Sequence, residues 1–422
     1  MVHFLKVSDN MLTEIGKRVK NAAAQLAVAS TEDKNKILMA IAAALRENCK
    51  EIVKANEIDL QNGIENGMSQ AFLDRLMLDN DRVEGMAKGV EDVVSLPDPV
   101  GKILWETERP NGMKIQRVSS PLGVVGIIYE ARPNVTSDAA ALCIKTGNTA
   151  ILRGGKEAFN SNSAIMDIMR EAIRKAGFNP DIVELVRDTS RESSTALMRM
   201  NEYVDVLIPR GSANLIKAVV QNSTVPVIET GAGNCHVYVD EFADIDMAVE
   251  IINNAKTRRI SVCNTAESLL IHKNIAEFAL IAIKAKLDEK NVILYGDEVA
   301  CEICPDILKA TEDDWAREYL DYKLSVKIVS SIDEAIEHIR KYSTHHSESI
   351  VTENLENAEK FLNEVDSAAV YHNVSTAFTD GGEFGFGAEI GISTQKLHAR
   401  GPLGLEQLNS FKYKIYGNGQ VR

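Results

Sequence analysis

One cysteine of this chain has neighbours that could make its thiol a nucleophile. Cys263 lies in the segment TRRISVCNTAESLLIH, residues 257–272, shortly after Arg258 and Arg259. A thiol reacts as its thiolate, and a nearby cation or a helix N-terminus lowers its pKa from about 8.5. Asn264 and Thr265 are residue types common at helix caps, so a helix start is expected here. These residues allow covalent catalysis, although an isolated cysteine is more often a small buried side chain.

Two further segments carry groups that could hold a phosphate. Gly211 and Ser212 follow a predicted strand and precede a predicted helix, where free backbone N–H groups can bind an anion. They do not complete a GxGxxG fingerprint, so an ordinary turn is the alternative. Arg153 and Lys156 follow another predicted strand, where open α/β sheets bind ligands, or they lie in a solvated turn. If a dinucleotide binds here, these two cations favour NADP over NAD.

Other candidate residues have strong structural alternatives. Glu229 lies at a predicted strand end and is either a general base or a helix-capping or surface carboxylate. His236 falls within an apolar alternating run, which favours a core histidine over a catalytic one. Cys301 and Cys304 form a lone CxxC without a second pair or a histidine at zinc-finger spacing, so we assign no metal site.

The elements that must position these residues follow from the hydrophobic pattern. Residues 9 to 95 carry apolar side chains at helical spacing, which predicts a helical opening segment with Ser30 and Asp33 as a capping box. The pattern breaks at SLPDPVG, and two strand-like runs around Asn111 and Gly112 then predict a β-hairpin.

From residue 121 onward, short apolar runs alternate with amphipathic segments. The first series is VVGIIY, TAILRG, IVELVR, VDVLIP, VPVIET and CHVYVD, and the second is ESLLIH, NVILYG, LSVKIV, ESIVTEN and SAAVYHN. Strands separated by helical segments predict βαβ units in parallel, doubly wound sheets. The predicted fold class is therefore α/β with two domains, which suits 422 residues.

Composition and charge argue against several classes of function. The formal net charge of −14 disfavours nucleic acid as the main partner, because phosphate binding needs clustered cations. No apolar run approaches the roughly 18 residues needed to cross a bilayer, so we expect no membrane partner. The first residues lack the pattern of a secretory signal, and we expect a cytoplasmic protein with reduced thiols.

Five blocks of the sequence, in order, resemble the aldehyde dehydrogenase superfamily. They are YEARPNVTSDAAALCIKTGNTAILRGGKEA, GNCHVYVD, SVCNTAESLLIH, HSESIVTEN and GFGAEIGISTQKLHARGP. The resemblance covers essentially the whole chain and implies an aldehyde dehydrogenase-like α/β fold. In that fold, residues 1–100 and 121–231 would bind NADP(H), and residues 232–400 would form the catalytic domain. Residues 101–120 and 401–422 would form a small β oligomerisation element.

The resemblance also implies catalytic roles. Cys263 matches the superfamily's nucleophile, and Asn134 matches the amide that forms the oxyanion hole with the backbone N–H of Cys263. Glu229 aligns with the base that activates water in hydrolytic members. Around the nucleophile, Arg258 and Ile260 depart from the residues more usual in the family, which puts the fine geometry of this loop in question.

Cofactor and substrate residues follow by the same resemblance. Gly211 and Ser212 match the cofactor turn, Arg153 matches an adenosine-ribose lysine, and Glu318 resembles a carboxylate near the nicotinamide ribose. Lys156 stands where NAD-preferring relatives carry glutamate, so the expected cofactor is NADP(H). Several polar side chains of the tail are expected to bind substrate, namely Glu389, Ser393, Thr394, Lys396, His398 and Arg400.

Within the superfamily the resemblance is to enzymes that reduce L-glutamyl 5-phosphate to L-glutamate 5-semialdehyde, the second step of proline biosynthesis. It implies attack by Cys263, loss of phosphate, and reduction of the thioester by NADPH. A hydrolytic or acylating aldehyde dehydrogenase for another acyl group is the alternative, and a catalytically inactive scaffold is the alternative from another class. The expected partners are a second copy, in a homodimer or homotetramer, and transiently glutamate 5-kinase.

Overall fold

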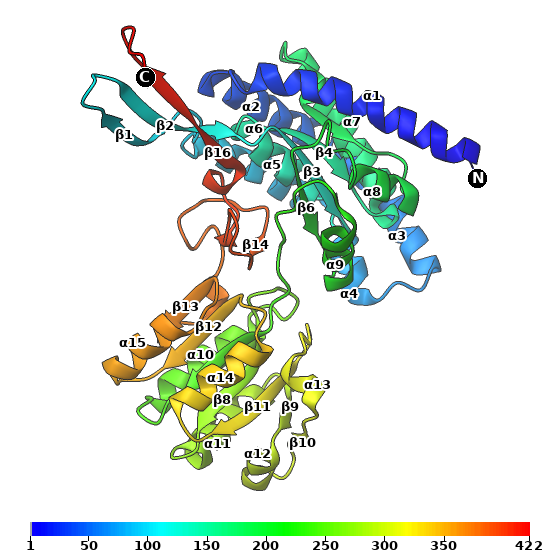
Figure 1. Ribbon diagram of the computed structural model, residues 1–422. Helices are drawn as coiled ribbons and strands as arrows, with labels where there is room; N and C mark the ends of the chain where they lie inside the picture. Colours follow the sequence, from blue (N-terminus) through cyan, green and yellow to red (C-terminus); the bar gives the residue numbers. More distant parts are fainter. Residues whose placement is uncertain (1) are drawn as a thin grey trace. The chain divides into compact units, whose positions relative to one another are not determined.

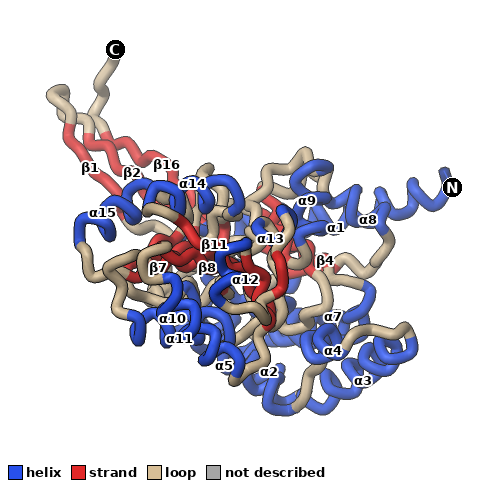
Figure 2. The backbone as a smooth tube through the Cα atoms, turned by 90° about the horizontal axis from the view of Figure 1, so that it is seen from below, coloured by secondary structure: helices blue, strands red, loops and turns tan. Residues whose placement is uncertain are grey.

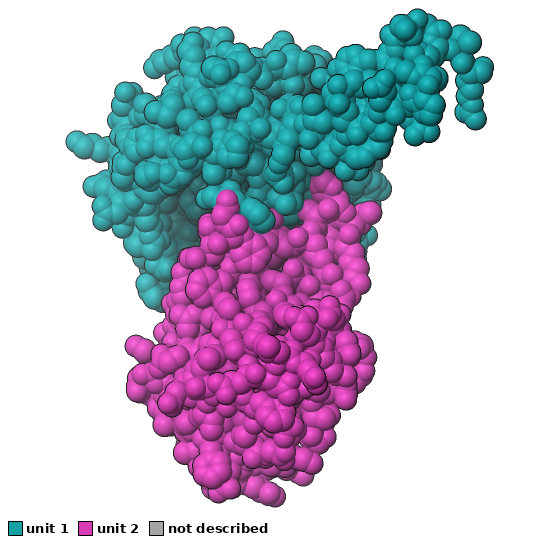
Figure 3. Space-filling view, turned by 90° about the vertical axis from the view of Figure 1, so that its left-hand side faces the viewer, with its two compact units in different colours: residues 1–230, 386–391, 403–422 teal, residues 231–385, 392–402 magenta. Residues whose placement is uncertain are grey.

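The computed structural model describes residues 2–422 and places the side chains of 11–70 and 72–422. The chain divides into two compact units, coloured separately in Figure 3. The first unit comprises residues up to 230 together with 386–391 and 403–422, and the second comprises 231–385 and 392–402. The sequence placed 386–391 with the catalytic domain. In the structure this segment packs on the first unit, where Ile390 N–H donates to the carbonyl of Leu403 at 3.0 Å.

The first unit is built on a four-stranded parallel sheet in the order β5-β4-β3-β6 (Figure 1). Its strands are β3 (Val124–Tyr129), β4 (Thr149–Arg153), β5 (Val183–Leu185) and β6 (Val206–Arg210). The run VPVIET was predicted as a strand, and this prediction is wrong. It forms no ladder and meets β6 in an isolated bridge between Val227 and Leu207, because Pro226 has no N–H to extend the pairing.

Helices cover both faces of this sheet. Leu12 and Val19 of α1 pack in one apolar cluster with Ile128, while Tyr129, which points to the opposite face, hydrogen-bonds Thr136 of α6 at 2.7 Å. The predicted capping box of α2 is present. The helices of the unit are α1 (Val2–Leu26), α2 (Thr31–Glu47), α3 (Cys49–Glu65), α4 (Gln70–Leu76), α5 (Asn80–Ser95), α6 (Val135–Lys145), α7 (Phe159–Lys175), α8 (Arg191–Leu197) and α9 (Ala213–Asn222), with 3₁₀ turns η1 (Lys156–Ala158), η2 (Pro180–Ile182) and η4 (Glu406–Leu408).

A separate three-stranded antiparallel sheet extends from the first unit. It consists of β1 (Ile103–Glu108), β2 (Lys114–Pro121) and β16 (Asn409–Tyr416), which lie side by side in Figures 1 and 2. The β1–β2 hairpin with its Asn-Gly turn is confirmed, and β16 pairs with β2 along its whole length. Segments 103–121 and 409–416, almost 300 residues apart, therefore form one structure.

The second unit is built on a seven-stranded parallel sheet in the order β10-β9-β11-β8-β7-β12-β13. Its strands are β7 (Cys235–Val239), β8 (Ala266–His272), β9 (Ile293–Gly296), β10 (Leu308–Lys309), β11 (Lys323–Val329), β12 (Ser347–Val351) and β13 (Ala369–His372), with a short antiparallel pair β14 (Ile392–Ser393) and β15 (Gly401–Pro402). The helical elements are α10 (Ile245–Thr257), α11 (Ala276–Asp288), α12 (Glu298–Ile303), α13 (Glu312–Trp315), α14 (Ile332–Tyr342), α15 (Leu355–Glu364) and η3 (Thr376–Phe378).

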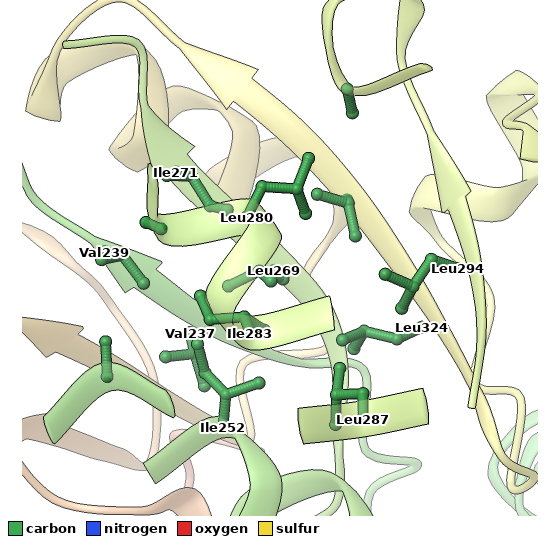
Figure 4. Packing of buried hydrophobic residues seen from close by; sticks show 14 of the residues in the cluster. Val237, Val239, Ile252, Leu269, Ile271, Leu280, Ile283, Leu287, Leu294 and Leu324 are labelled. Atoms are coloured by element: carbon green, nitrogen blue, oxygen red, sulfur yellow. The ribbon is translucent and has the colours of Figure 1, made fainter. Parts of the chain in front are cut away.

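Alternating side chains of the central strands form two cores in this unit. Val237 and Leu269 point toward Ile252 of α10 and the helix α11 (Figure 4), whereas Tyr238 points to the opposite face and stacks on Phe361 of α15. The predicted α/β class with two parallel, doubly wound sheets is therefore confirmed. No helix within the described residues is long and apolar enough to cross a bilayer.

Candidate active site

Cys263 lies in the turn between α10 and β8, and its side chain is half-buried. The helix start predicted after it is wrong. Residues from Ala266 onward form β8, a fully buried strand between β7 and β11, because Leu269 and Ile271 pack in the core on one face of the sheet and Leu270 packs in the core on the other. No helix N-terminus is therefore available here to lower the pKa of the thiol.

The entry to β7 holds the backbone of Cys263 in place. A Cβ on Gly233 would collide with the carbonyl oxygen of Cys263 and would lie 2.7 Å from its Cα, so only glycine fits at this position. The thiol of Cys235 donates to the same carbonyl at 3.2 Å. The peptide of Cys263 is thus packed directly against the start of the neighbouring strand.

A third segment completes this arrangement. Glu318 accepts a hydrogen bond from Gly233 N–H at 2.7 Å. Because Gly233 packs directly against the backbone of Cys263, only this glycine separates the Glu318 carboxylate from that backbone. Gly233, Cys263 and Glu318 precede β7, β8 and β11, three neighbouring parallel strands. Residues that precede such strands meet at one edge of the sheet, which explains why positions so far apart in sequence converge.

Asn264 and Thr265, which the sequence suggested as helix caps, instead hold the loop through hydrogen bonds to other segments. Asn264 donates to the carbonyls of Ala377 and Thr379 at 3.2 and 3.1 Å, and Thr376 donates its hydroxyl to the carbonyl of Asn264 at 2.8 Å. The hydroxyl of Thr265 donates to the carbonyl of Arg259 at 2.7 Å. These bonds fix the turn on both sides of the nucleophile.

A buried ion pair lies behind the same loop. Lys256, in the last turn of α10, and Glu267, in β8, are 2.6 Å apart and have no exposed side-chain surface. Glu267 also accepts from Leu320 N–H at 3.1 Å. Burial raises the pKa of Glu267 to about 7, against the opposing effect of Lys256, and burial lowers the pKa of Lys256. The pair joins both ends of the Cys263 loop to the segment of Glu318.

In the first unit, the residues predicted to bind the cofactor lie at the carboxyl ends of adjacent strands. Gly211 and Ser212 form the turn between β6 and α9, and the Ser212 hydroxyl caps α9 through Leu215 N–H at 3.4 Å. The turn also holds Glu130, which sequence reasoning missed. Its carboxylate accepts from Ser212 N–H at 2.7 Å and from the Ser212 hydroxyl at 2.9 Å.

The two predicted cations follow β4 and differ in their surroundings. Arg153 is half-buried and donates to the backbone carbonyls of Thr189 and Ser190 at 2.7 and 3.0 Å. Burial lowers the pKa of its guanidinium from the ordinary value. Lys156, at the start of η1, is exposed. Lys156 is therefore the more accessible cation of the two.

Asn134 is the N-cap residue of α6, also at the carboxyl end of the first sheet. Its side-chain amide donates to Asp138, one turn along the helix, at 2.8 Å. Burial raises the pKa of Asp138 to about 6, opposed by its hydrogen bonds from Asn134 and Ser137 and by the charge of Arg210. The amide predicted for the oxyanion hole is thus oriented by a carboxyl group.

The predicted substrate residues of the tail do not form one loop on one unit. Glu389 belongs to the first unit, whereas Ser393, Thr394, His398 and Arg400 belong to the second. Ser393 is buried in β14, Thr394 contacts Gly231, and His398 adopts a positive φ of 72°.

Two cations of the tail pair with one carboxylate. Arg400 donates to Asp366 at 2.8 Å, and Lys396 forms a second ion pair with Asp366. These two partners lower the pKa of Asp366 to about 2. Lys396 and Arg400 of the tail therefore form one ion-pair cluster with Asp366.

The weaker candidates have clear structural surroundings. His236 is buried in β7 and pairs with Glu348 through Nδ1 at 3.1 Å, so the expected core role is confirmed. Glu229 is half-buried and belongs to the first unit. Cys301 lies on α12 and Cys304 is the C-cap residue of that helix, and burial raises the pKa of both thiols. No cluster of metal-ligating side chains occurs within the described residues.

Comparisons with known proteins identify the family and the fold of this chain. The aldehyde dehydrogenase family model matches residues 3–319. A gamma-glutamyl phosphate reductase from Clostridium perfringens strain SM101 is 60% identical over 415 residues, which is 98% of this chain and 100% of that protein. The crystal structure of gamma-glutamyl phosphate reductase from Thermotoga maritima superposes with a TM-score of 0.95 at 50% identity, covering 97% of this chain and 99% of the other.

A more distant solved structure, gamma-glutamyl phosphate reductase from Saccharomyces cerevisiae, is 33% identical over 97% of this chain and 98% of its own, with a TM-score of 0.54. The family predicted from the five sequence blocks is confirmed by a match that spans most of the chain and by relatives aligned over nearly all of it. This chain belongs to the aldehyde dehydrogenase family.

Proposed function

We propose that this chain reduces L-glutamyl 5-phosphate to L-glutamate 5-semialdehyde and phosphate, using NADPH and a covalent thioester on Cys263. The observation that carries the proposal is the half-buried Cys263 turn, held by Gly233 on one side and by η3 on the other, with Glu318 beside it. Relatives of this length and identity that are named gamma-glutamyl phosphate reductase support the choice of acyl group.

The residues of the chain perform the covalent steps. The thiolate of Cys263 attacks the acyl carbon, and the bond to phosphate breaks with inorganic phosphate as the leaving group. The backbone N–H of Cys263 and the amide of Asn134 stabilise the oxyanion, and Asp138 orients that amide. NADPH, when bound, supplies the hydride that reduces the thioester. The thiohemiacetal on Cys263 then collapses, which releases the semialdehyde and restores the thiolate.

The first unit fits a dinucleotide. Gly211 offers a turn without a side chain, and Ser212 offers a hydroxyl and an N–H at the start of a ten-residue helix. The exposed Lys156 suits a 2′-phosphate, with Arg153 beside it, so NADP(H) is the proposed cofactor. Glu318 would lie near the nicotinamide ribose, since it borders the Cys263 backbone.

The substrate has an α-amino acid end that needs charged partners. We assign this role to the tail residues Glu389, Ser393, Thr394, His398 and Arg400, of which Arg400 brings a cation held by Asp366. Glu229 is not required for the phosphate-releasing reaction, because no water has to be activated. A hydrolytic or acylating reaction on another acyl group, which would use Glu229 as the base, is the alternative.

The three-stranded sheet is the proposed contact with a second copy in a homodimer or homotetramer. Its exposed apolar side chains are large, with Trp105 48%, Tyr413 54% and Ile415 62% exposed, and β1 and β16 each leave one edge unpaired within this sheet. Because an acyl phosphate hydrolyses readily, we also propose transient association with glutamate 5-kinase. The proposed location is the cytoplasm.

The decisive experiment is the reverse reaction with glutamate 5-semialdehyde, NADP⁺ and inorganic phosphate. Cys263→Ala should lower kcat about a thousandfold or more, because the covalent route is lost. Cys301→Ala, a half-buried cysteine of the same unit, is the matched control and should retain activity. The wild-type rate should fall to background when phosphate is omitted. Retained activity in Cys263→Ala, or turnover without phosphate, contradicts the proposal.

A further inference from the structure

The carboxylate of Glu130 fills the mouth of the β6–α9 turn. Glu130 directly follows β3, and its two oxygens accept from the backbone N–H and the hydroxyl of Ser212 at 2.7 and 2.9 Å. A Cβ added to Gly211 would lie 2.5 Å from the same carboxylate. The diphosphate of a dinucleotide would use the same two donors of Ser212 and the same space beside Gly211, which the carboxylate now fills.

The backbone places Glu130 between both segments of the proposed cofactor site. Its N–H donates to the carbonyl of Arg210 at 3.3 Å, and its carbonyl accepts from Arg132 N–H at 2.7 Å. A Cβ on Gly155, next to Lys156, would lie 3.5 Å from the Cα of Glu130. The main chain is therefore fixed, and only the side chain can move away from Ser212.

Charge makes joint occupancy unfavourable. A carboxylate is stabilised at a helix N-terminus, and hydrogen bonds to a charged acceptor are about twice as strong as neutral ones. A diphosphate would bring further negative charge to the same two donors.

We propose that Glu130 occupies the diphosphate subsite as long as no dinucleotide is bound and must swing out when one binds, which sets the cofactor affinity. The inference rests on the proposed function, because it takes the first unit as the NADP(H) site. It assigns Glu130 to the diphosphate and leaves Lys156 to the 2′-phosphate. Substitutions of these two residues should therefore change the binding of different parts of the cofactor.

The test is binding of NADPH, NADH and adenosine 2′-monophosphate, measured by calorimetry on wild type, Glu130→Gln and the control Glu192→Gln, an exposed glutamate on α8. Glutamine keeps an oxygen acceptor for Ser212 but removes the charge. Glu130→Gln should bind both dinucleotides about tenfold more tightly and leave the monophosphate unchanged. Lys156→Ala should weaken NADPH and adenosine 2′-monophosphate but not NADH.

Thermal unfolding of each variant without cofactor checks that the fold is retained. Dinucleotide affinity that is unchanged or weaker in Glu130→Gln, while wild type binds NADPH well, overturns this inference alone. An equal gain in Glu192→Gln also overturns it, because the effect would then be one of net charge. Wild-type protein that binds neither dinucleotide contradicts the proposed function together with the inference.

Discussion

Replacing Lys256 by methionine should destabilise the second unit by about 3 to 5 kcal/mol, because it leaves the carboxyl group of Glu267 buried without its partner. The two side chains are 2.6 Å apart, and neither has exposed surface. Solvent cannot replace the lost interaction at such a site. The one remaining hydrogen bond described for the Glu267 carboxylate, from Leu320 N–H at 3.1 Å, is too weak to do so.

The loss of stability caused by Lys256→Met should depend on pH. With Lys256 present, the pKa of Glu267 is already raised from 4.5 to about 7. This shift means that the folded protein disfavours the ionised carboxylate by about 3 kcal/mol relative to the unfolded chain. A raised carboxyl pKa means that the folded state binds more protons, so stability falls as pH rises from 4.5 to 7. Without Lys256 the pKa rises further. The difference in the free energy of unfolding between wild type and Lys256→Met should therefore grow above pH 7, by up to about 1.4 kcal/mol per pH unit.

Tryptophan fluorescence in urea can measure this change within the second unit. The chain has two tryptophans, and in a Trp105→Phe background only Trp315, on α13, reports. Lys309→Met is the matched control, because that lysine forms an exposed pair with Glu298 and should change stability by less than about 1 kcal/mol. A Lys256→Met deficit no larger than that of the control, or one that does not grow between pH 7 and 9, refutes the reasoning.

Two further substitutions test the site geometry. Gly233→Ala forces a Cβ into the carbonyl of Cys263, so it should lower the free energy of unfolding by about 3 kcal/mol or more and slow the alkylation of Cys263 by iodoacetamide. The control Gly89→Ala, whose Cβ meets open space, should change neither quantity. Asp138→Asn removes a carboxyl group whose folded pKa is raised from 3.8 to about 6, so the variant should gain stability relative to wild type by up to about 3 kcal/mol between pH 4 and 7. Denaturation at several pH values measures this gain, and a difference that is flat with pH contradicts it.

Local patterns predicted most of the elements because each element's own residues determine them. The capping box of Ser30 and Asp33, the hairpin around Asn111 and Gly112, and ten of the eleven apolar runs appear as expected. The errors arose where a local signal had more than one meaning. Asn and Thr after Cys263 suggest a helix cap, but the turn they form leads into the buried strand β8.

The partners within the site could not be predicted in this way, because they depend on which strands become neighbours. Glu130 and Ser212 are 82 residues apart, and Gly233 and Glu318 are 85 apart, yet each pair forms a hydrogen bond of 2.7 Å. No spacing rule connects such positions in a single sequence. Only the strand orders β4-β3-β6 and β11-β8-β7 bring them together.

Strand order also explains why the two halves of the proposed chemistry use opposite edges of their sheets. In the first unit, Asn134, Lys156 and Ser212 follow strands, where helical turns begin and free N–H groups can bind an anion. In the second, Gly233 and Cys263 precede strands, where no helix begins. The segment that follows Cys263 therefore supplies no helix dipole, and charged side chains near the loop are the groups we expect to lower the pKa of its thiol. Moving charge near the loop, as in Lys256→Met, should therefore shift the pH at which Cys263 is alkylated, whereas the control Lys309→Met in the same unit, which loses an exposed ion pair, should leave that pH unaltered.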